Sequence, residues 1–521
     1  MRPKIFVAAS LAILAADLLL RFNLIDVPLG RDEGGYAYVG REILSGALLY
    51  RDAFDLRPPG PFYLYALALA VVPATPAGIH VFLHLYNLAT CLALFSLARA
   101  LGTSTAAALW TALAYAVASS LPGVQGFQAS SELLMLLPLV LAMRLALASG
   151  PRRRGALVLA GVLTALACWI KQTAFLSLAF LPFWIALVPR RPRAEAARDL
   201  LAFGGGAVAV SLAIVGAFAS AGVLRELLYW SFEHPLLYAR TDFLFGRAMA
   251  QLWELLSGSP VLSAAALVGL VVAARRARRQ AVFLFALLGL SLVAVLPGKA
   301  YEHYFVQLLP PLCLAAGIGL DACVSRVREP RMRVAATLAA GAALVLLPLA
   351  VAPGYYLRWS PDEIARAEFG ANPFVESADI ADYLRTRTAP GERVLIVGSE
   401  PQILFLAGIR SATPFIYFYP VFEPFPRHVE FQQRIWDEVR AAPPAWIVQV
   451  DLKSSFALAA GAERLLLDRL KELIASDYEP RAVALIETPK GRIIPLDDDV
   501  LPFARGAIER AAGRIFLYRR R

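Results

Sequence analysis

The sequence predicts a polytopic α-helical membrane protein whose C-terminal part is an extracytoplasmic α/β domain. Hydrophobic residues make up 58% of the 521 positions and charged residues only 17%. Soluble domains are nearer to half apolar and a quarter charged, so this composition indicates an integral membrane protein. Long apolar runs fill residues 1–352, whereas alternating helix and strand patterns follow from about residue 360.

About eleven segments are long and apolar enough to cross a bilayer, since a crossing helix needs about 20 mostly apolar residues. One further run, 61–72, is short and flanked by prolines. Its length fits an interfacial helix better than a crossing. The predicted spans lie near residues 4–22, 78–99, 105–121, 131–149, 155–171, 173–189, 199–221, 257–274, 280–297, 304–321 and 334–352.

Short basic tracts between the apolar runs predict the orientation of the chain in the membrane. Positive residues in short loops mark the cytoplasmic side. All the tracts fall on one side if 61–72 is interfacial, but the later tracts change sides if 61–72 is a span. We therefore expect a cytoplasmic N-terminus and an extracytoplasmic C-terminal domain. The tracts are Arg2 with Lys4, Arg99, 152–154, 190–198, 275–279 and 326–333.

Charge and cysteine content exclude other classes of protein. The net charge of +11 suggests nucleic acid as a partner, but the arginines cluster in loops where anionic lipid and topology explain them. All four cysteines lie in apolar segments, so no disulfide framework is predicted. The first apolar run has no small-residue cleavage site before the acidic loop, and we expect it to be an uncleaved span.

Two domains are expected: a transmembrane domain, 1–352, with its first outer loop at 23–77, and an extracytoplasmic α/β domain, 353–521. The segment "ADIADYLRTRTAPGERVLIVGSEPQILFLAGI" is typical of a helix, a turn, a strand and a second helix, and similar units follow. "VGSEPQILFLAG" lacks the clustered glycines of a pyrophosphate loop. We expect this domain to be accessory, serving acceptor recognition or covering the cavity.

The first outer loop is unusually rich in charge for a connector between spans. Asp32 and Glu33 precede a predicted short helix that carries Tyr36 and ends near Gly46. Carboxylates at a helix N-terminus are favoured by the helix dipole, so these acids could be simple capping groups on a solvated loop. The alternative is a carboxylate held at the membrane surface as a general base or metal ligand.

A basic residue, Arg57, follows in "DLRPPGPFYLY", where two prolines stiffen the chain before the predicted interfacial helix. Arginine suits bidentate contact with phosphate, although snorkelling toward lipid headgroups is the alternative. Other ionisable residues lie at the outer ends of spans, where they are costly and are functional candidates by default. Their gathering on one side favours a shared polar cavity. They are Glu132, Lys171, Lys299, Glu302 and His303.

The stretch "RDEGGYAYVGREILSGALLYRD…DLRPPGPFYLYALAL" resembles the first outer loop of the C-type glycosyltransferases. It is most similar to the bacterial family 39 and aminoarabinose-transferase-like groups, which are related to protein O-mannosyltransferases. Their pattern is an Asp-Glu pair, a Tyr-rich helix, and a basic residue with two prolines. "SSELLMLLPLVLAM", "WIKQTAFL" and "EHYFVQLLPPLCLAAGIGL" resemble the family in order and spacing, so the resemblance covers about residues 20–325.

This resemblance implies a transferase that uses a polyprenyl-phosphate-linked sugar on the outer face of the membrane. Asp32 matches the acidic position proposed as catalytic base, and Glu132 matches the second acidic position. Arg57 falls where relatives carry a basic residue, usually Lys, that faces the lipid phosphate. The remaining expected substrate contacts are Glu33, Tyr36, Lys171, Lys299, Glu302 and His303.

Metal dependence stays open, because Leu56 stands where some relatives have an acid or amide that helps to hold a metal. The candidate ligands of a divalent ion are Asp32, Glu132 and His303. The chemistry of the transfer is consistent with the residues. A carboxylate takes the acceptor proton while an oxocarbenium-like state develops, and cations stabilise the leaving phosphate.

Two rival functions remain. A lipid or oligosaccharide transporter or flippase would also have many spans and buried charges, but transporters usually show inverted repeats and midplane sites, which this sequence lacks. A catalytically inactive scaffold would use the α/β domain for binding. The sugar, the acceptor and the length of the lipid are not encoded in any recognisable motif.

The orientation of the C-terminal domain gives a direct test. A reporter that is active only outside the cytoplasm, fused after Arg521, should be active, and the same reporter fused at Arg153 should be inactive. The basic tracts are the physical reason. The reverse pattern would overturn the assignment of every outer-face residue.

Overall fold

The computed structural model describes residues 3–188, 192–241, 244–297, 299–456, 458, 462–488, 490–496 and 501–521. Arg2 and the first residues of the basic tract at 190–198 lie outside these residues. The chain divides into two compact units. The first unit comprises Met1–Ile25, His80–Leu224 and Pro235–Arg358, and the second comprises Asp26–Ile79, Arg225–His234 and Trp359–Arg521. The predicted first outer loop therefore lies in one unit with the C-terminal residues.

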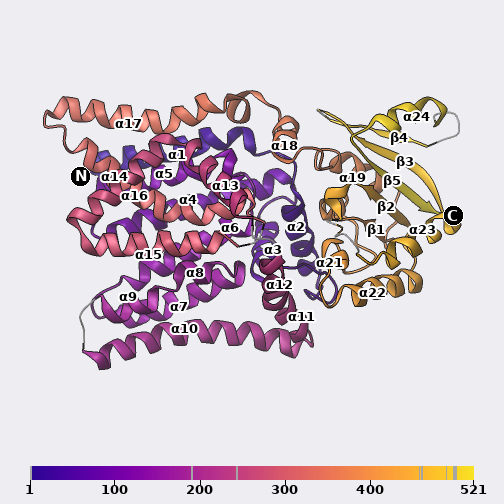
Figure 1. The fold of residues 1–521 in the computed structure, drawn as a ribbon, viewed down its shortest axis with the longest axis horizontal. Coiled ribbons are helices and arrows are strands. Elements are labelled where there is room, and N and C mark those ends of the chain that lie inside the picture. The colour runs from indigo at the N-terminus through magenta and orange to yellow at the C-terminus, as the bar shows by residue number, and fades with distance from the viewer. Residues whose placement is uncertain are drawn as a thin grey trace. The chain divides into compact units, whose positions relative to one another are not determined.

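The first unit consists of helices (Figure 1). Its main helices are α1 (Pro3–Arg21), α4 (Pro76–Ala100), α5 (Thr105–Ala118), α6 (Ser131–Ala146), α7 (Arg153–Ile170), α8 (Ala174–Leu178), α9 (Leu181–Leu187), α10 (Arg193–Ser220), α12 (His234–Thr241), α13 (Phe245–Gly258), α14 (Pro260–Arg276), α15 (Arg278–Val295), α16 (Leu309–Val324) and α17 (Pro330–Val351). Short 3-10 and π turns occur at Phe22–Leu24, Pro122–Val124, Glu302–Leu308 and Gly354–Arg358.

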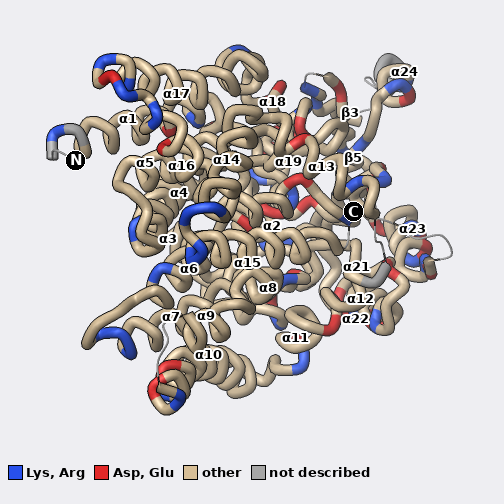
Figure 2. Tube along the Cα trace, turned by 60° about the vertical axis from the view of Figure 1, so that its left-hand side comes forward, with Lys and Arg blue, Asp and Glu red and all other residues tan. Residues whose placement is uncertain are grey.

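Seven helices among the described residues are long and apolar enough to cross a membrane, or eight if the bent pair α13–α14 is one span. These helices make the chain a multi-pass membrane protein. Charged residues are sparse along them and gather near their ends (Figure 2). Four of the predicted spans fall on shorter helices, namely α5, α6, α8 with α9, and α14, which meets α13 at 98°. Eleven crossings therefore stay a prediction.

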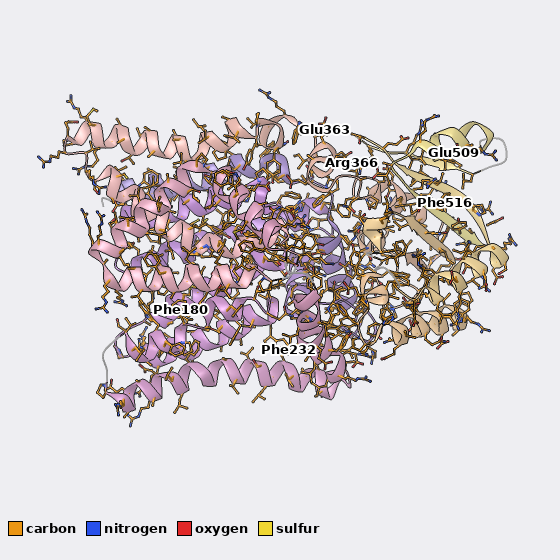
Figure 3. All side chains as sticks on the ribbon, in the orientation of Figure 1. Phe180, Phe232, Glu363, Arg366, Glu509 and Phe516 are labelled. Carbon is orange, nitrogen blue, oxygen red and sulfur yellow. The ribbon has the colours of Figure 1, made fainter. Side chains whose placement is uncertain are left out.

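Small residues let the helices of the first unit approach closely. A Cβ on Gly269 of α14 would lie 1.8 Å from the carbonyl oxygen of Ala315, and one on Gly319 of α16 would lie 1.9 Å from that of Ala265. Helix pairs in membranes commonly pack through such small residues. Aromatic rings fill wider gaps: Phe180, labelled in Figure 3, packs edge-on against Phe283, with ring centroids 5.1 Å apart.

The second unit combines helices with one sheet. Its helices are α2 (Arg31–Leu44), α3 (Gly60–Val71), α11 (Leu224–Leu228), α18 (Pro361–Phe369), α19 (Ser377–Arg385), α20 (Pro401–Ala407), α21 (Tyr419–Phe422), α22 (His428–Ala441), α23 (Leu465–Asp477) and α24 (Leu501–Arg510), with shorter turns at Tyr229–Glu233 and Lys453–Ser455. Its strands are β1 (Val394–Val397), β2 (Trp446–Asp451), β3 (Tyr478–Ile486), β4 (Ile493–Pro495) and β5 (Gly513–Arg520).

The strands form a five-stranded sheet in the order β1-β2-β5-β3-β4. β1 and β2 are parallel, with Val394 opposite Trp446, and the other neighbours are antiparallel. Buried apolar residues of β1, β2 and β3 form the core of this sheet. Arg366, labelled in Figure 3, forms an ion pair with Glu376. Glu376 also accepts a hydrogen bond from the Gly491 amide, so the pair joins the start of this region to the loop before β4. The helix, strand and second helix expected in "ADIADYLRTRTAPGERVLIVGSEPQILFLAGI" are confirmed as α19, β1 and α20.

Glycines on α2 allow close packing inside the second unit. A Cβ on Gly35 would lie 1.8 Å from the hydroxyl oxygen of Tyr417, and one on Gly34 would lie 2.4 Å from the Cβ of Gln402. At these two glycines α2 has no side chain. Its backbone therefore lies directly against Gln402 of α20 and against Tyr417, which precedes α21. The predicted end of α2 is also confirmed, because Gly46, just beyond the helix, has a φ of +88° that favours glycine.

The contact at Gly35 predicts a sensitive position. Gly35→Ala should lower the stability of the second unit by about 1–3 kcal/mol, because the added methyl group must displace the Tyr417 ring. Thermal unfolding of the purified protein in detergent would measure the loss. The matched control is Gly204→Ala on α10, where a Cβ meets open space. Equal stability of Gly35→Ala and the wild type would contradict this packing.

Candidate active site

The first turn of α2 places two carboxylates in different surroundings. The amide of Gly30, the residue before the helix, donates to Oε2 of Glu33 at 3.4 Å, and Glu33 is fully buried. Asp32 keeps 32% of its side chain exposed. Both acids benefit from the positive end of the helix dipole. Glu33 therefore caps the helix, whereas Asp32 is the carboxylate that remains accessible.

Arg57 joins Asp32 to a second carboxylate that is entirely buried. Its Nη2 lies 2.7 Å from Oδ2 of Asp32, and its Nη1 lies 2.9 Å from Oδ1 of Asp55. Asp55 has no exposed side-chain surface. Asp55 and Arg57 are only two residues apart in the loop, directly before Pro58 and Pro59. The guanidinium is thus shared between two carboxylates.

Aromatic rings complete the surroundings of Arg57. Its guanidinium carbon lies 5.1 Å from the ring centre of Tyr36 and 5.8 Å from that of Tyr417. Tyr36 packs edge-on against Phe62 and Tyr65 of α3. A cation over an aromatic face is stabilised by the ring quadrupole, and more so when desolvated. The side chain is therefore held from several directions with 16% of its surface exposed.

Burial sets the protonation of this cluster. It raises the pKa of Asp55 to about 6, even though the neighbouring Arg57 guanidinium opposes the shift. Burial alone would lower the pKa of Arg57, but the carboxylates of Asp32 and Asp55 outweigh it and hold that pKa well above its ordinary value. Arg57 therefore stays charged, and Asp55 is the member that titrates near neutral pH.

A second ion pair lies in the first unit. Glu132 is in the first turn of α6, which is capped by the Ser130 hydroxyl, and Lys171 directly follows α7. Lys171 Nζ lies 2.6 Å from Oε1 of Glu132, and the Ser131 hydroxyl donates to the same carboxylate at 2.9 Å. Lys171 also lies over the Tyr304 ring, 5.1 Å from its centre. This buried carboxylate is therefore ionically paired.

The other predicted residues of the first unit have separate partners. Lys299 lies over the Tyr238 ring at 5.0 Å. Glu302 accepts a hydrogen bond from Gln251 at 3.1 Å. A ring nitrogen of His303 lies 3.2 Å from Oε1 of Gln125, and its ring stacks on Tyr301.

The predicted site residues thus fall into clusters within each unit. Asp32, Tyr36 and Arg57 are in contact in the second unit, and Glu132 and Lys171 are in contact in the first. One cavity shared by all of them stays a prediction. Among the residues that the structure describes, no group of three or more His, Cys, Asp and Glu side chains could hold a metal ion.

Two members of the cluster were missed in the sequence. Asp55 was visible as a loop acid, and its spacing of two from Arg57 was the signal that could have identified it. Tyr417 has no local signal. Its hydroxyl donates to the backbone oxygen of Arg31 at 3.1 Å, from 386 residues further along the chain.

No protein-family model and no curated protein matches the chain. Solved structures do match. ArnT from Cupriavidus metallidurans, solved bound to undecaprenyl phosphate, superposes with a TM-score of 0.60 at 17% identity, over 94% of this chain and 98% of that one. The oligosaccharyltransferase of Archaeoglobus fulgidus, solved with zinc and sulfate, matches with a TM-score of 0.51 at 16% identity, over 94% and 74% of the two chains.

The chain has the C-type glycosyltransferase fold. At these identities the similarity is one of fold, and it confirms the fold class expected from the first outer loop. The matches extend over both units, so the C-terminal residues belong to the shared architecture.

The raised pKa of Asp55 predicts a pH-dependent stability. Its folded pKa of about 6 exceeds the ordinary value of 3.8, so the folded state binds the proton more tightly. The stability that this protonation contributes is complete below about pH 4 and is lost as the pH rises to about 6. Relative to Asp55→Asn, the wild type should lose up to about 3 kcal/mol across this window.

Thermal unfolding in detergent at several pH values measures this difference. Asp52→Asn is the control: Asp52 is a partly exposed acid of the same loop, and its hydrogen bond from Arg51 lowers its pKa. The difference in unfolding free energy between Asp52→Asn and the wild type should stay constant between pH 4 and 6, because Asp55 is present in both. Parallel curves for the wild type and Asp55→Asn would contradict the assignment.

Proposed function

We propose that the chain is an integral-membrane glycosyltransferase. It moves a sugar from a polyprenyl-phosphate donor to a lipid, glycan or protein acceptor on the outer face of the cytoplasmic membrane. The observation that carries the proposal is the Asp32–Arg57 pair, which presents an accessible carboxylate and a fixed guanidinium together. The fold that the chain shares with ArnT, which was solved with undecaprenyl phosphate, supports a donor of this class.

Asp32 is the proposed general base. The acceptor hydroxyl oxygen forms a bond to the anomeric carbon while the bond between that carbon and the phosphate oxygen breaks. The hydroxyl proton passes to the Asp32 carboxylate, and the electron pair of the broken bond leaves with the polyprenyl phosphate. A positioned carboxylate at this point of the reaction follows the chemistry of glycosyl transfer.

Arg57 is the proposed binding group for the leaving phosphate. A guanidinium carries five N–H donors in a planar fork, so it can contact phosphate while one edge stays bonded to Asp55. Its positive charge stabilises the negative charge that develops on the leaving group. Asp55 and the rings of Tyr36 and Tyr417 hold the fork in place, which spares the ordering of a flexible side chain during the reaction.

Lys171 and Glu132 are proposed as a second polar pair that serves the donor. A lysine–glutamate pair at the end of membrane helices is costly to retain for stability alone. Lys171 supplies a compact positive charge suited to phosphate. Lys299, Glu302 and His303 are proposed only as supporting substrate contacts, whereas the fully buried Glu33 is proposed to hold the start of α2.

Partners and location follow from the same reaction. A donor with a long lipid tail enters from the bilayer, so membrane lipids are the second class of partner, and no nucleic acid is involved. The proposed location is the cytoplasmic membrane, with the N-terminus inside and residues 353–521 outside. The basic tracts support this orientation.

Asp32→Asn tests the proposal. It keeps size and hydrogen bonding but removes the proton acceptor, so turnover should fall by roughly 10²- to 10⁴-fold. The measurement is transfer of radiolabelled sugar from a panel of undecaprenyl-phosphate hexoses and pentoses by the purified protein. Arg57→Ala, in contrast to Asp32→Asn, should lower donor affinity as well as turnover.

Glu33→Gln is the neighbouring comparison, since Glu33 caps the helix and faces Gly30. It should lose less turnover than Asp32→Asn. Near-normal turnover of Asp32→Asn with loss in Glu33→Gln would show that the base is misassigned. Movement of intact donor lipid across vesicles without any sugar transfer would favour a flippase instead.

A further inference from the structure

The side chain before the proposed base is anchored to residues far along the chain. Arg31 Nε donates to the backbone oxygen of Ser399 at 2.5 Å, and its Nη2 lies 2.5 Å from Oε1 of Glu400. Nη2 also donates to Oδ1 of Asn372 at 3.1 Å. Glu400 follows Arg31 by 369 residues. All of these residues belong to the second unit.

This anchor is buried and tightly enclosed. Arg31 has 13% of its side chain exposed and Glu400 has none. The guanidinium lies between the rings of Phe374 and Tyr419, at 5.3 and 5.5 Å from their centres. Glu400 also accepts a hydrogen bond from Gln402 at 2.8 Å. A buried charge is stable only when paired and hydrogen-bonded, and both charges meet that condition.

The backbone of the same turn is held as well. The Tyr417 hydroxyl donates to the Arg31 carbonyl oxygen, and Tyr417 is one of the two rings beside Arg57. The far end of α2 is fixed separately, because Arg41 donates to the carbonyl oxygens of Leu404, Phe405 and Ile409. Arg31 is therefore one of the side chains that fix the end of α2 at which Asp32 lies.

We propose that Arg31, held by Glu400, is a positioning residue that fixes the first turn of α2 and so aims Asp32 at the reacting hydroxyl. This inference rests on the proposed function, since it assigns Asp32 as the base. It also gives the C-terminal residues a direct part in building the site. Arg31 itself contacts protein groups and is assigned no contact with the substrate.

Positioning has a kinetic consequence that differs from binding. A displacement of about 1 Å in a catalytic group can cost 10²-fold in rate. Donor affinity is assigned mainly to Arg57, whose bond to Asp55 does not involve Arg31. Loss of the anchor should therefore lower kcat and leave the donor KM nearly unchanged.

The experiment compares four variants in the full-length protein. Arg31→Met removes the guanidinium, and Arg31→Lys keeps the charge but loses the planar fork. Arg31→Met combined with Glu400→Gln removes both charges, so that no buried carboxylate is left without its cation. The matched control is Arg51→Met, which removes an exposed arginine of the same loop that pairs with the neighbouring Asp52.

Arg31→Met and the double variant should each lower kcat by roughly 10- to 100-fold, with the donor KM within about threefold of the wild type. Arg31→Lys should recover part of the loss, and Arg51→Met should match the wild type. The donor panel is the one used for Asp32. Hydrogen exchange of the peptide covering α2 should become faster in Arg31→Met, while exchange in β1, β2 and β5 stays unchanged.

Normal turnover in the double variant would overturn the inference, and so would a donor KM that rises in step with the fall in kcat. Faster exchange throughout the second unit, in both Arg31→Met and the double variant, would show a general loss of stability and would also overturn it. Failure of the proposed function gives a different result from failure of this inference. If the proposed function is wrong, the wild type itself transfers no sugar from any donor of the panel.

Discussion

A buried guanidinium must be neutralised by groups that the chain brings to it, and Arg57 imposes this requirement on the second unit. Two carboxylates and two aromatic rings surround it. They come from α2, from the loop before α3 and from the segment before α21. Removing an ion from water costs several kcal/mol unless its partners are placed well. Folding of this unit therefore joins segments that are hundreds of residues apart.

The same constraint explains why the two acids of the Asp-Glu pair differ. Glu33 turns back to the helix start and is sealed from water, whereas Asp32 shares Arg57 and keeps an open edge. The first unit uses a comparable arrangement, in which Lys171 neutralises the buried Glu132 at the ends of two helices. Each unit thus contains a carboxylate paired with a cation, Asp32 with Arg57 and Glu132 with Lys171.

Local patterns in the sequence predicted much of this structure. The helix with Asp32 in its first turn, the glycine after it and the helix–strand alternation of the C-terminal residues all follow from spacing within a few dozen residues. The number of spans stays a prediction, because α5 and α6 end earlier than their apolar runs and α14 bends sharply from α13. Apolar runs report burial, and burial inside a helical bundle gives the same signal as burial in lipid. Tyr417 and Glu400 were invisible because no periodicity links them to the first loop.

The contacts of Arg31 change how the C-terminal residues are understood. From the sequence they were expected to be accessory, because the charged residues upstream already formed a plausible site. A site also needs groups that hold the proposed reacting groups in place. Gly34 and Gly35 have no side chains where α2 meets Gln402 and Tyr417, so α2 and the C-terminal segment fit together at backbone distance. A helix packed this closely along one face and anchored at both ends has little freedom to shift. Residues 372–419 are therefore part of the scaffold that defines where Asp32 lies, and an exchange of this region between relatives would have to conserve that fit.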